Sequence, residues 1–148
     1  MKYRKAEIKD LDALTILFDK YRVFYRKDSD IASAKSFLKA RISNQDSEIF
    51  VAENTEQQLV GFVQLYPLFS STKMMKLWLL NDLFVNYDYR KKGISLGLMD
   101  KAKELVEKSG ACGMYLETEK SNLVGNNLYP KAGFELNQDS NFYEWHCK

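Results

Sequence analysis

The chain has 148 residues, of which 45% are hydrophobic and 14% aromatic, and its formal net charge at pH 7 is +2. This composition excludes a disordered chain, and the length predicts a single domain covering residues 1–148. The small net charge argues against a nucleic-acid-binding protein, because such proteins present a broad basic surface.

Cysteine, histidine and the N-terminal residues exclude further classes. Cys112 and Cys147 lie outside any Cys-x-x-Cys spacing, so we expect a cytoplasmic protein without a disulfide framework. His146 is the only histidine, which excludes a histidine-based metal cluster. The first ten residues are charged and lack the apolar core of a secretory signal, and no apolar run approaches the ~18 residues of a membrane span. We therefore expect neither a metal nor a membrane partner.

The hydrophobic pattern predicts the elements of an α/β (α+β) domain in chain order. Residues 2–8 read as a strand, and apolar residues recurring at helical spacing follow from Leu11 to Tyr25. Ser29 or Asp30 can cap a second helix, whose apolar stripe runs from Ile31 to Ile42. Three strands are then predicted over residues 48–52, 59–68 and 75–85.

The second half of the chain continues the alternation. Helical spacing returns at Ile94 and stops at Gly110. A short strand over 114–117 and a helix over 122–129 come next, and Pro130 should end or kink that helix. Residues 134–136 and 142–145 are predicted as the final strands. This order favours a sheet with helices on both faces.

The most informative segment lies between Asn81 and Ser95. An apolar strand ends at Val85, a short polar turn follows, and three cations and a glycine come directly before a helix. Backbone N–H groups and the helix dipole favour an anion at such a helix start. The pattern predicts a phosphate or pyrophosphate site, although a solvated basic turn has the same composition. The candidate phosphate-binding residues are Arg90, Lys91, Lys92, Gly93, Ile94 and Ser95.

Three segments together resemble the GNAT (Gcn5-related N-acetyltransferase) superfamily. Trp78–Val85 is similar to the fourth strand of that family, and Arg90–Ser95 resembles its Arg/Gln-x-x-Gly-x-Gly/Ala pyrophosphate loop, with serine in place of the last Gly or Ala. Asn122–Phe134 resembles the Asn-x-x-Ala-x-x-Leu-Tyr-x-Lys-x-Gly-Phe signature, with Pro130 directly after the key tyrosine. The element order matches over nearly the whole chain.

The resemblance implies a fold, a co-substrate and an activity. The fold is a mixed, mostly antiparallel central sheet of about seven strands flanked by about four helices. The activity is acetyl-CoA-dependent N-acetyl transfer to the primary amine of a small molecule, since the nearest branch includes the spermidine/spermine acetyltransferases. A homodimer is also implied, because dimers are common in the family. Residues implied to hold the cofactor, besides the phosphate loop, are Leu83, Phe84, Val85 and Asn122, the last of which is equally well explained as a helix cap.

Acetyl transfer to an amine needs a base and an acid. The amine must lose a proton before it attacks the thioester, and the departing thiolate needs a proton or a hydrogen bond. Asp82 is the candidate base, with Glu117 as the second choice, and Asn81 can hold a water beside it but cannot itself accept the proton. Tyr129 is the candidate acid. The alternative role of Asp82 is that of a structural carboxylate that accepts hydrogen bonds at the strand end. The alternative role of Tyr129 is that of a packed aromatic ring.

The acceptor pocket is expected at the first two helices and the loop between them. Tyr21, Phe24 and Tyr25 can wall a small cation through their ring faces, and Arg22 can receive a carboxylate. A buried helix face would show the same aromatic pattern. Three other functions stay open: a protein or peptide N-acetyltransferase, a non-catalytic acyl-CoA-binding sensor on the same fold, and a nucleic-acid module that the low net charge disfavours.

Overall fold

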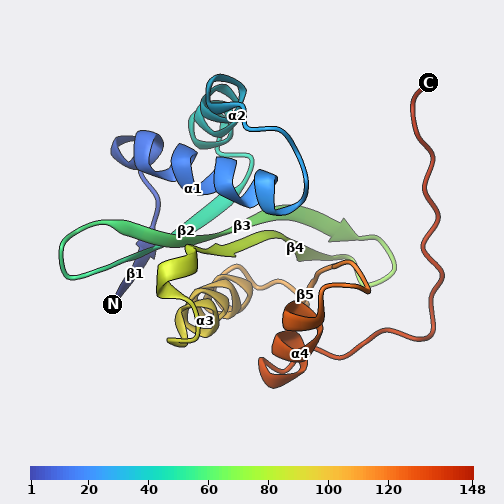
Figure 1. The fold of residues 1–148 in the computed structure, drawn as a ribbon. Coiled ribbons are helices and arrows are strands. Elements are labelled where there is room, and N and C mark those ends of the chain that lie inside the picture. Colours follow the sequence, from blue (N-terminus) through green and yellow to red (C-terminus); the bar gives the residue numbers. More distant parts are fainter. The chain divides into compact units, whose positions relative to one another are not determined.

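A computed structural model describes residues 1–148. The chain forms two compact units, residues 1–117 and residues 118–148. The first unit contains the sheet and three of the four α-helices (Figure 1). No helix in the chain has both the length and the apolar character needed to cross a membrane.

The sheet of the first unit has five strands in the order β1-β2-β3-β4-β5. Neighbouring strands are antiparallel except β4 and β5, which are parallel. The predicted strand at 75–85 is confirmed, and β3 extends two residues beyond its predicted end. The strands are β1 (Lys2–Lys5), β2 (Glu48–Glu53), β3 (Leu59–Ser70), β4 (Met75–Val85) and β5 (Met114–Tyr115).

A β-bulge interrupts the pairing of β3 with β4. Leu65 pairs with Leu80, but Gln64 pairs with Asp82, so Asn81 is the extra residue. Because side chains alternate along a strand, one extra residue reverses the face on which every later side chain lies. Asp82 therefore points to the same face as Phe84, whose partner Phe62 belongs to the hydrophobic core under the first two helices.

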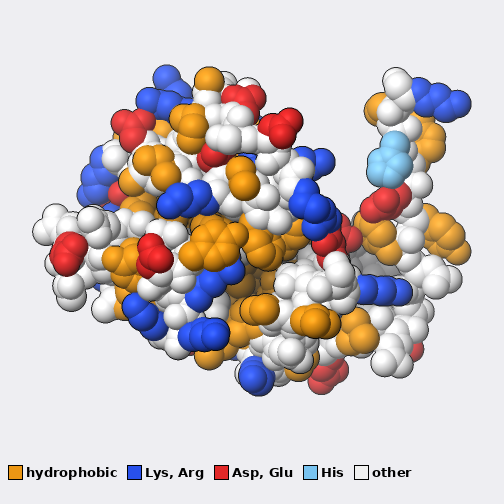
Figure 2. All heavy atoms as spheres, in the orientation of Figure 1, with side chains coloured by type: hydrophobic (Ala, Val, Ile, Leu, Met, Phe, Trp, Pro, Cys, Tyr) orange, Lys and Arg blue, Asp and Glu red, His pale blue; other side chains and the backbone are white.

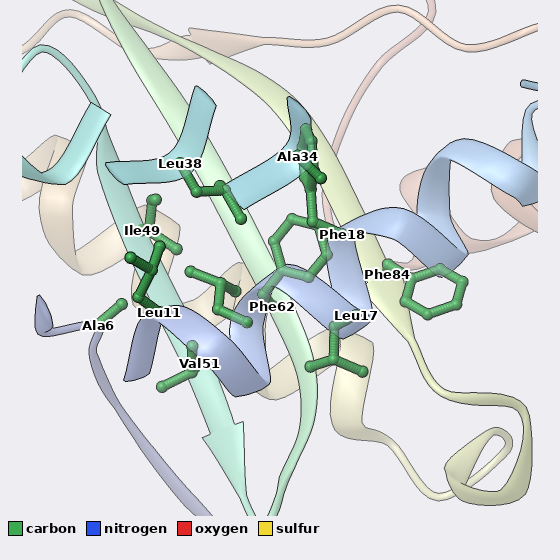
Figure 3. Packing of buried hydrophobic residues seen from close by; sticks show 11 residues of the cluster. Ala6, Leu11, Leu17, Phe18, Ala34, Leu38, Ile49, Val51, Phe62 and Phe84 are labelled. Carbon is green, nitrogen blue, oxygen red and sulfur yellow. The ribbon is translucent and has the colours of Figure 1, made fainter. Parts of the chain in front are cut away.

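Helices cover both faces of this sheet (Figure 1). The helices α1 (Leu11–Phe24) and α2 (Ile31–Asn44) lie on one face, and α3 (Ile94–Lys108) lies on the other. Leu14, Leu17 and Phe18 of α1 recur at helical spacing and are at most 7% exposed. They pack with Leu38 of α2 and Phe62 of β3 (Figure 3). This apolar layer fixes α1 above the bulged part of β4.

The predicted cap of α2 is Asp30, whose carboxylate accepts the Ser33 N–H at 3.0 Å. Ser29 has a different role and donates to the buried Asp19 carboxylate at 2.7 Å. Asp19 also accepts the Asp30 N–H at 2.8 Å. The loop between α1 and α2 is thus tied to α1 from within.

The second unit contains α4 (Leu123–Lys131), which passes through Pro130 and ends two residues later than predicted. Its end is a Schellman turn: Gly133 has φ +88°, its N–H bonds to Pro130 O, and the Phe134 N–H bonds to Tyr129 O. The rings of Tyr129 and Phe134 meet edge to face at 6.0 Å. The turn requires a positive φ at position 133, which glycine adopts readily, and the contact of Phe134 with Tyr129 is the apolar contact that accompanies such a turn.

The predicted final strands are wrong for this structure. Residues 134–136 and 142–145 form neither strand nor helix, so the sheet has five strands and not about seven. Their composition favours strands, but a strand also needs a neighbour to receive its hydrogen bonds, and these segments have none. Strand β5 is likewise shorter than the predicted 114–117.

Candidate active site

Asp82 is buried beside the bulge of β4. Its side chain is 5% exposed, and it accepts hydrogen bonds from Gln64 Nε2 at 2.8 Å and from Asn81 Nδ2 at 3.0 Å. Burial raises the pKa of Asp82, and the hydrogen bonds from Gln64, Tyr21 and Asn81 oppose this rise. No cation offsets the burial. A carboxylate whose pKa is raised in this way is better suited to accept a proton near neutral pH.

Tyr21 brings α1 to the same place. Its hydroxyl, which has one proton to donate, lies 3.4 Å from the Asn81 carbonyl oxygen and can instead donate to Asp82, whose pKa it lowers. Its ring packs edge to face against Phe62, Phe84 and Tyr25. The structure thus brings Tyr21, a residue of the predicted acceptor pocket, into contact with the candidate base Asp82 and with its neighbour Asn81.

The other predicted wall residues differ in their surroundings. Phe24 is 39% exposed and contacts Tyr25 with ring centroids 5.1 Å apart. Arg22 donates from Nη1 to the Asp28 carbonyl at 3.1 Å, inside the α1–α2 loop. Its visible role is therefore to hold the loop, and binding of an acceptor carboxylate by Arg22 stays a prediction.

Arg90 lies among aromatic rings and not in open solvent. Its guanidinium carbon is 4.0 Å from the ring centre of Tyr87 and 5.5 Å from those of Phe24 and Phe84. Its Nε donates to the Val85 carbonyl at 3.0 Å. This arrangement links the end of α1 to the turn after β4. The cation cluster in the sequence did not predict that Arg90 packs against aromatic rings. Tyr87 is 3 positions from Arg90 in the chain, and Phe24 is 66 positions away.

The turn before α3 has the geometry of an anion site. Lys91 and Gly93 have φ of 60° and 75°, and no side chain caps the N-terminus of α3. The first-turn N–H groups, which have no partner within a helix, are therefore not satisfied by a side chain. No atom lies within 4 Å of where a Gly93 Cβ would stand, so the turn is open above that glycine. Figure 2 shows lysine and arginine side chains around this part of the first unit.

One edge of β4 is available over its second half. β5 pairs only with Trp78 and Leu79, so the later residues of β4 have a strand neighbour on the β3 side alone. Leu83, Phe84 and Val85 lie on this stretch, next to the turn. An open strand edge leading to an uncapped helix start fits the two parts of coenzyme A, the amide-containing pantetheine arm and the pyrophosphate. The backbone N–H groups at the helix start are the donors that would bind the pyrophosphate.

The two site residues of the second unit have local contacts of their own. The Asn122 side chain accepts the Gly125 N–H at 3.1 Å and donates to Thr118 Oγ1 at 2.9 Å, so it caps α4. A Cβ on Gly125 would lie 2.6 Å from Asn122 Nδ2 and 3.2 Å from the Tyr129 ring. Glycine at this position, where the family signature has alanine, therefore leaves room for both side chains. Contact of Asn122 or Tyr129 with the co-substrate stays a prediction.

Two residues of the site have no part in the sequence prediction. Gln64 is fully buried on β3, and its Oε1 accepts a hydrogen bond from Ser47 Oγ at 2.9 Å. The one sequence feature that could have identified Gln64 is that it is a single polar residue within the apolar run of β3.

No three side chains among the histidines, cysteines, aspartates and glutamates lie where they could hold a metal ion, and a metal-free reaction remains a prediction.

The fold and this site define an acyltransferase of the GNAT type, and comparison with known proteins agrees. The profile of the acetyltransferase (GNAT) family matches residues 12–134, and the chain belongs to that family. It is 41% identical over 145 residues to an uncharacterized N-acetyltransferase, YhfO, of Bacillus subtilis (strain 168), covering 98% of this chain and 95% of that one.

A solved structure and a more distant enzyme extend the comparison. The crystal structure of a probable acetyltransferase superposes with a TM-score of 0.95 at 34% identity, covering 100% of this chain and 99% of the other. A streptothricin acetyltransferase of Escherichia coli is 29% identical over 102 residues, which are 69% of this chain and 55% of that enzyme.

Proposed function

We propose that the chain transfers the acetyl group of acetyl-CoA to the primary amine of a small molecule. The observation that carries this proposal is the position of Asp82, a buried carboxylate without a cation, at the bulge where β4 loses its second strand neighbour. Strand β4 thereby carries both a base for the amine and the open strand edge at which the co-substrate would bind.

The roles of the chain's residues follow from this geometry. Acetyl-CoA, when bound, supplies the acetyl thioester. The backbone N–H groups of Ile94 and Ser95, with Lys91 and Lys92, would hold its pyrophosphate. Asp82 Oδ takes a proton from the acceptor ammonium, directly or through a water held by Asn81, so that the amine can attack. Tyr129 Oη donates a proton to the departing sulfur.

A small, cationic acceptor is supported by the aromatic side chains at the end of α1. Tyr21, Phe24 and Tyr25 form a chain of edge-to-face contacts, of which Tyr21 interacts with Asp82, and ring faces attract an ammonium group. The name of the streptothricin acetyltransferase points to a small-molecule acceptor for that relative. We propose polyamines, amino acids and related amines as the acceptor class.

A thiol-release assay tests this proposal. Acetyl-CoA is offered with polyamines, single amino acids, streptothricin and peptides with free N-termini, and the Asp82→Asn variant serves as the control. We expect release with at least one small amine and little with peptides. Release with peptides alone would move the chain to the protein acetyltransferases. Binding of acetyl-CoA without release for any acceptor would make it a sensor.

We also propose a homodimer whose interface includes the C-terminal segment. Leu136, Phe142, Tyr143 and Trp145 are between 72% and 86% exposed, and Figure 2 shows hydrophobic side chains along this segment. Exposed apolar stretches of this kind usually mark an interaction surface. Light scattering should give the mass of a dimer, and Phe142→Ser with Trp145→Ser should give a monomer. Phe69→Ser with Met74→Ser, which changes equally exposed residues at the β3–β4 turn, should remain dimeric.

We propose the cytoplasm as its location and no nucleic-acid partner. Both cysteines are free, which suits a reducing compartment, and the net charge of +2 gives little attraction to nucleic acid. Fractionation of cells and a mobility-shift assay across salt concentrations test these two statements.

A further inference from the structure

Asp82 is one end of a hydrogen-bonded chain that runs across the sheet. Gln64 Nε2 donates to Asp82 Oδ2 at 2.8 Å, and Ser47 Oγ donates to Gln64 Oε1 at 2.9 Å. Gln64 is 0% exposed and Asp82 is 5% exposed. Gln64 and Asp82 are also register partners in the β3–β4 pairing, directly beside the bulge.

Along this hydrogen-bonded series, each donor faces an acceptor. An ionised carboxylate only accepts hydrogen bonds, so the nitrogen of the Gln64 amide must face Asp82. The amide oxygen then faces away and needs a donor, which the Ser47 hydroxyl supplies. A buried amide left without these partners would be costly. Ser47 therefore holds the amide in the orientation that Asp82 requires.

The other groups around Asp82 do not replace this contact. Tyr21 from α1 and Asn81 from β4 also donate to it. Tyr66 of β3 is neutral, because burial and the charge of Asp82 raise the pKa of Tyr66 to about 12. Arg41 and Asp46, which also act on Tyr66, pair with each other at 2.7 Å. No cation bonds to Asp82, and of its two amide donors Gln64 at 2.8 Å is nearer than Asn81 at 3.0 Å.

We propose that Gln64 and Ser47 are positioning residues for acetyl transfer: Gln64 aims and stabilises the Asp82 carboxylate, and Ser47 fixes the Gln64 amide. The proposal rests on the proposed function, because it gives Asp82 its role as base. It adds two residues that touch no substrate and act only through Asp82.

The two residues should differ in the size of their effect. Removing Gln64 deletes the hydrogen bond to the carboxylate itself. Removing the Ser47 hydroxyl leaves the amide in place, and Ser47 also lines a cavity of about 140 Å³ beside Lys5, Ile42 and Gln45. A cavity of that size has room for water, which can take over part of the hydroxyl's role. The effect of Gln64 should therefore exceed that of Ser47.

The test compares Gln64→Leu, Ser47→Ala and the control Val63→Ala. Val63 is equally buried and adjacent in β3, but it pairs with Leu83 and lies on the opposite face of the sheet. Two properties are measured for each variant: the acidic limb of the pH profile of kcat/KM, and the titration of the Asp82 carboxyl carbon by carbon-13 NMR. The second measurement needs no acetyl transfer.

For Gln64→Leu, we expect both the limb and the NMR midpoint to move upward by about one pH unit, the size expected when one hydrogen bond to a charged group is lost. Ser47→Ala should move them in the same direction by less, and Val63→Ala should move neither. A folded Gln64→Leu variant with wild-type limb and midpoint would overturn the proposal. Should Gln64→Leu not fold, Ser47→Ala decides alone: a midpoint equal to that of Val63→Ala would overturn it.

Failure of the proposed function gives a different result. If no amine is acetylated, the NMR midpoint still reports whether Gln64 and Ser47 control Asp82. If acetylation occurs but the limb does not follow the Asp82 midpoint in any variant, Asp82 is not the base and the two residues do not position the reaction.

Discussion

Two buried aspartates of the first unit, Asp10 and Asp82, are in opposite electrostatic states. Asp10 is 7% exposed and accepts two hydrogen bonds from the Arg4 guanidinium, at 2.7 and 2.8 Å. The bonds from Arg4 lower the pKa of Asp10. Asp82 is 5% exposed and has only neutral donors, so burial raises its pKa. Similar burial therefore produces a structural ion pair in one place and a group ready to take a proton in the other.

The difference comes from the elements that supply the partner. Arg4 lies on β1 and bonds both Asp10 and Glu53, so it ties the first strand to the second and to the turn before α1. Asp82 lies at a bulge in the sheet, where Gln64 and Asn81 provide amides. A cation beside Asp82 would make it a weaker base. We therefore expect Asp10 to stabilise the fold, and this contrast supports the proposal that Asp82 is the base.

The largest expected effect is on kcat in the Asp82→Asn variant. Asparagine keeps the shape but cannot accept the proton, so kcat should fall by about 10²- to 10⁴-fold, the usual contribution of general acid–base catalysis. Steady-state kinetics measures this loss, and calorimetry should show unchanged affinity for acetyl-CoA. Asp10→Asn should keep kcat per folded molecule. Equal losses of kcat in the two variants would contradict the proposal that Asp82, and not Asp10, takes part in the reaction.

The second prediction concerns Tyr129, the proposed acid. Tyr129→Phe removes only the hydroxyl, so kcat should fall by about 10²-fold while KM for acetyl-CoA changes little, because the lost interaction belongs to the transition state. The matched control is Tyr143→Phe, which removes a hydroxyl from a residue that is 86% exposed. If Tyr129→Phe keeps wild-type kcat while chemistry limits the rate, Tyr129 serves only its ring contact with Phe134.

A third prediction separates co-substrate binding from the chemistry at Asp82. Gly93→Asp places a side chain and a negative charge at the start of α3, so affinity for acetyl-CoA should fall by about 100-fold or more, as expected when two charge-assisted hydrogen bonds are lost. Gly110→Asp is the control. It has φ +66° and open space like Gly93, but it lies beyond the other end of α3. Calorimetry on both variants should show loss for Gly93→Asp alone.

The smallest effect is on stability, and its sign differs between the aspartates. Asp10→Asn should cost about 2 kcal/mol of unfolding free energy at neutral pH, less than a fully broken buried pair because Arg4 keeps Glu53. The folded pKa of Asp10 is lowered, so the pair stabilises fully above the usual Asp range, about 4, and this stability is lost as pH falls through the folded pKa. The difference between wild type and Asp10→Asn should therefore close in acid.

Asp82 should behave in the reverse way. Its folded pKa is raised, so the fold favours its protonated form, and stability decreases as pH rises from the usual Asp range to the folded pKa. Asp82→Asn should then be as stable as the wild type or more stable at neutral pH, with a smaller difference in acid. Denaturant titrations at neutral and acidic pH measure both variants. A marked loss of stability in Asp82→Asn at neutral pH would count against its role as an unpaired base.

The sequence predicted the elements of this fold where periodicity and caps agree. The run from Met75 to Val85 is β4 as predicted, and Asp30, one of the two predicted caps, begins α2. Prediction failed where a partner decides the structure. Residues 142–145 have strand composition but pair with no strand, and α4 continues one residue beyond Pro130.

The site was predictable in its types of residue but not in its contacts. Asp82 was identifiable as a carboxylate in the second half of the predicted strand 75–85, but only the bulge at Asn81 places it on the buried face. Gln64 and Ser47 are distant from Asp82 in sequence, and only the strand register brings Gln64 to Asp82 and Ser47 to Gln64. Arg90 was expected to bind phosphate, and its aromatic neighbours come from α1, from β4 and from the turn after β4.

The most direct test of the account is a carbon-13 carboxyl titration of the aspartate-labelled chain, with Asp82→Asn and Asp10→Asn used to assign the two signals. The account predicts that Asp82 titrates above the usual Asp range, at the midpoint of the acidic limb of kcat/KM, while Asp10 titrates below that range. An Asp82 signal that titrates with or below ordinary aspartates, or an acidic limb that persists unchanged in Asp82→Asn, would contradict the assignment of Asp82 as the base.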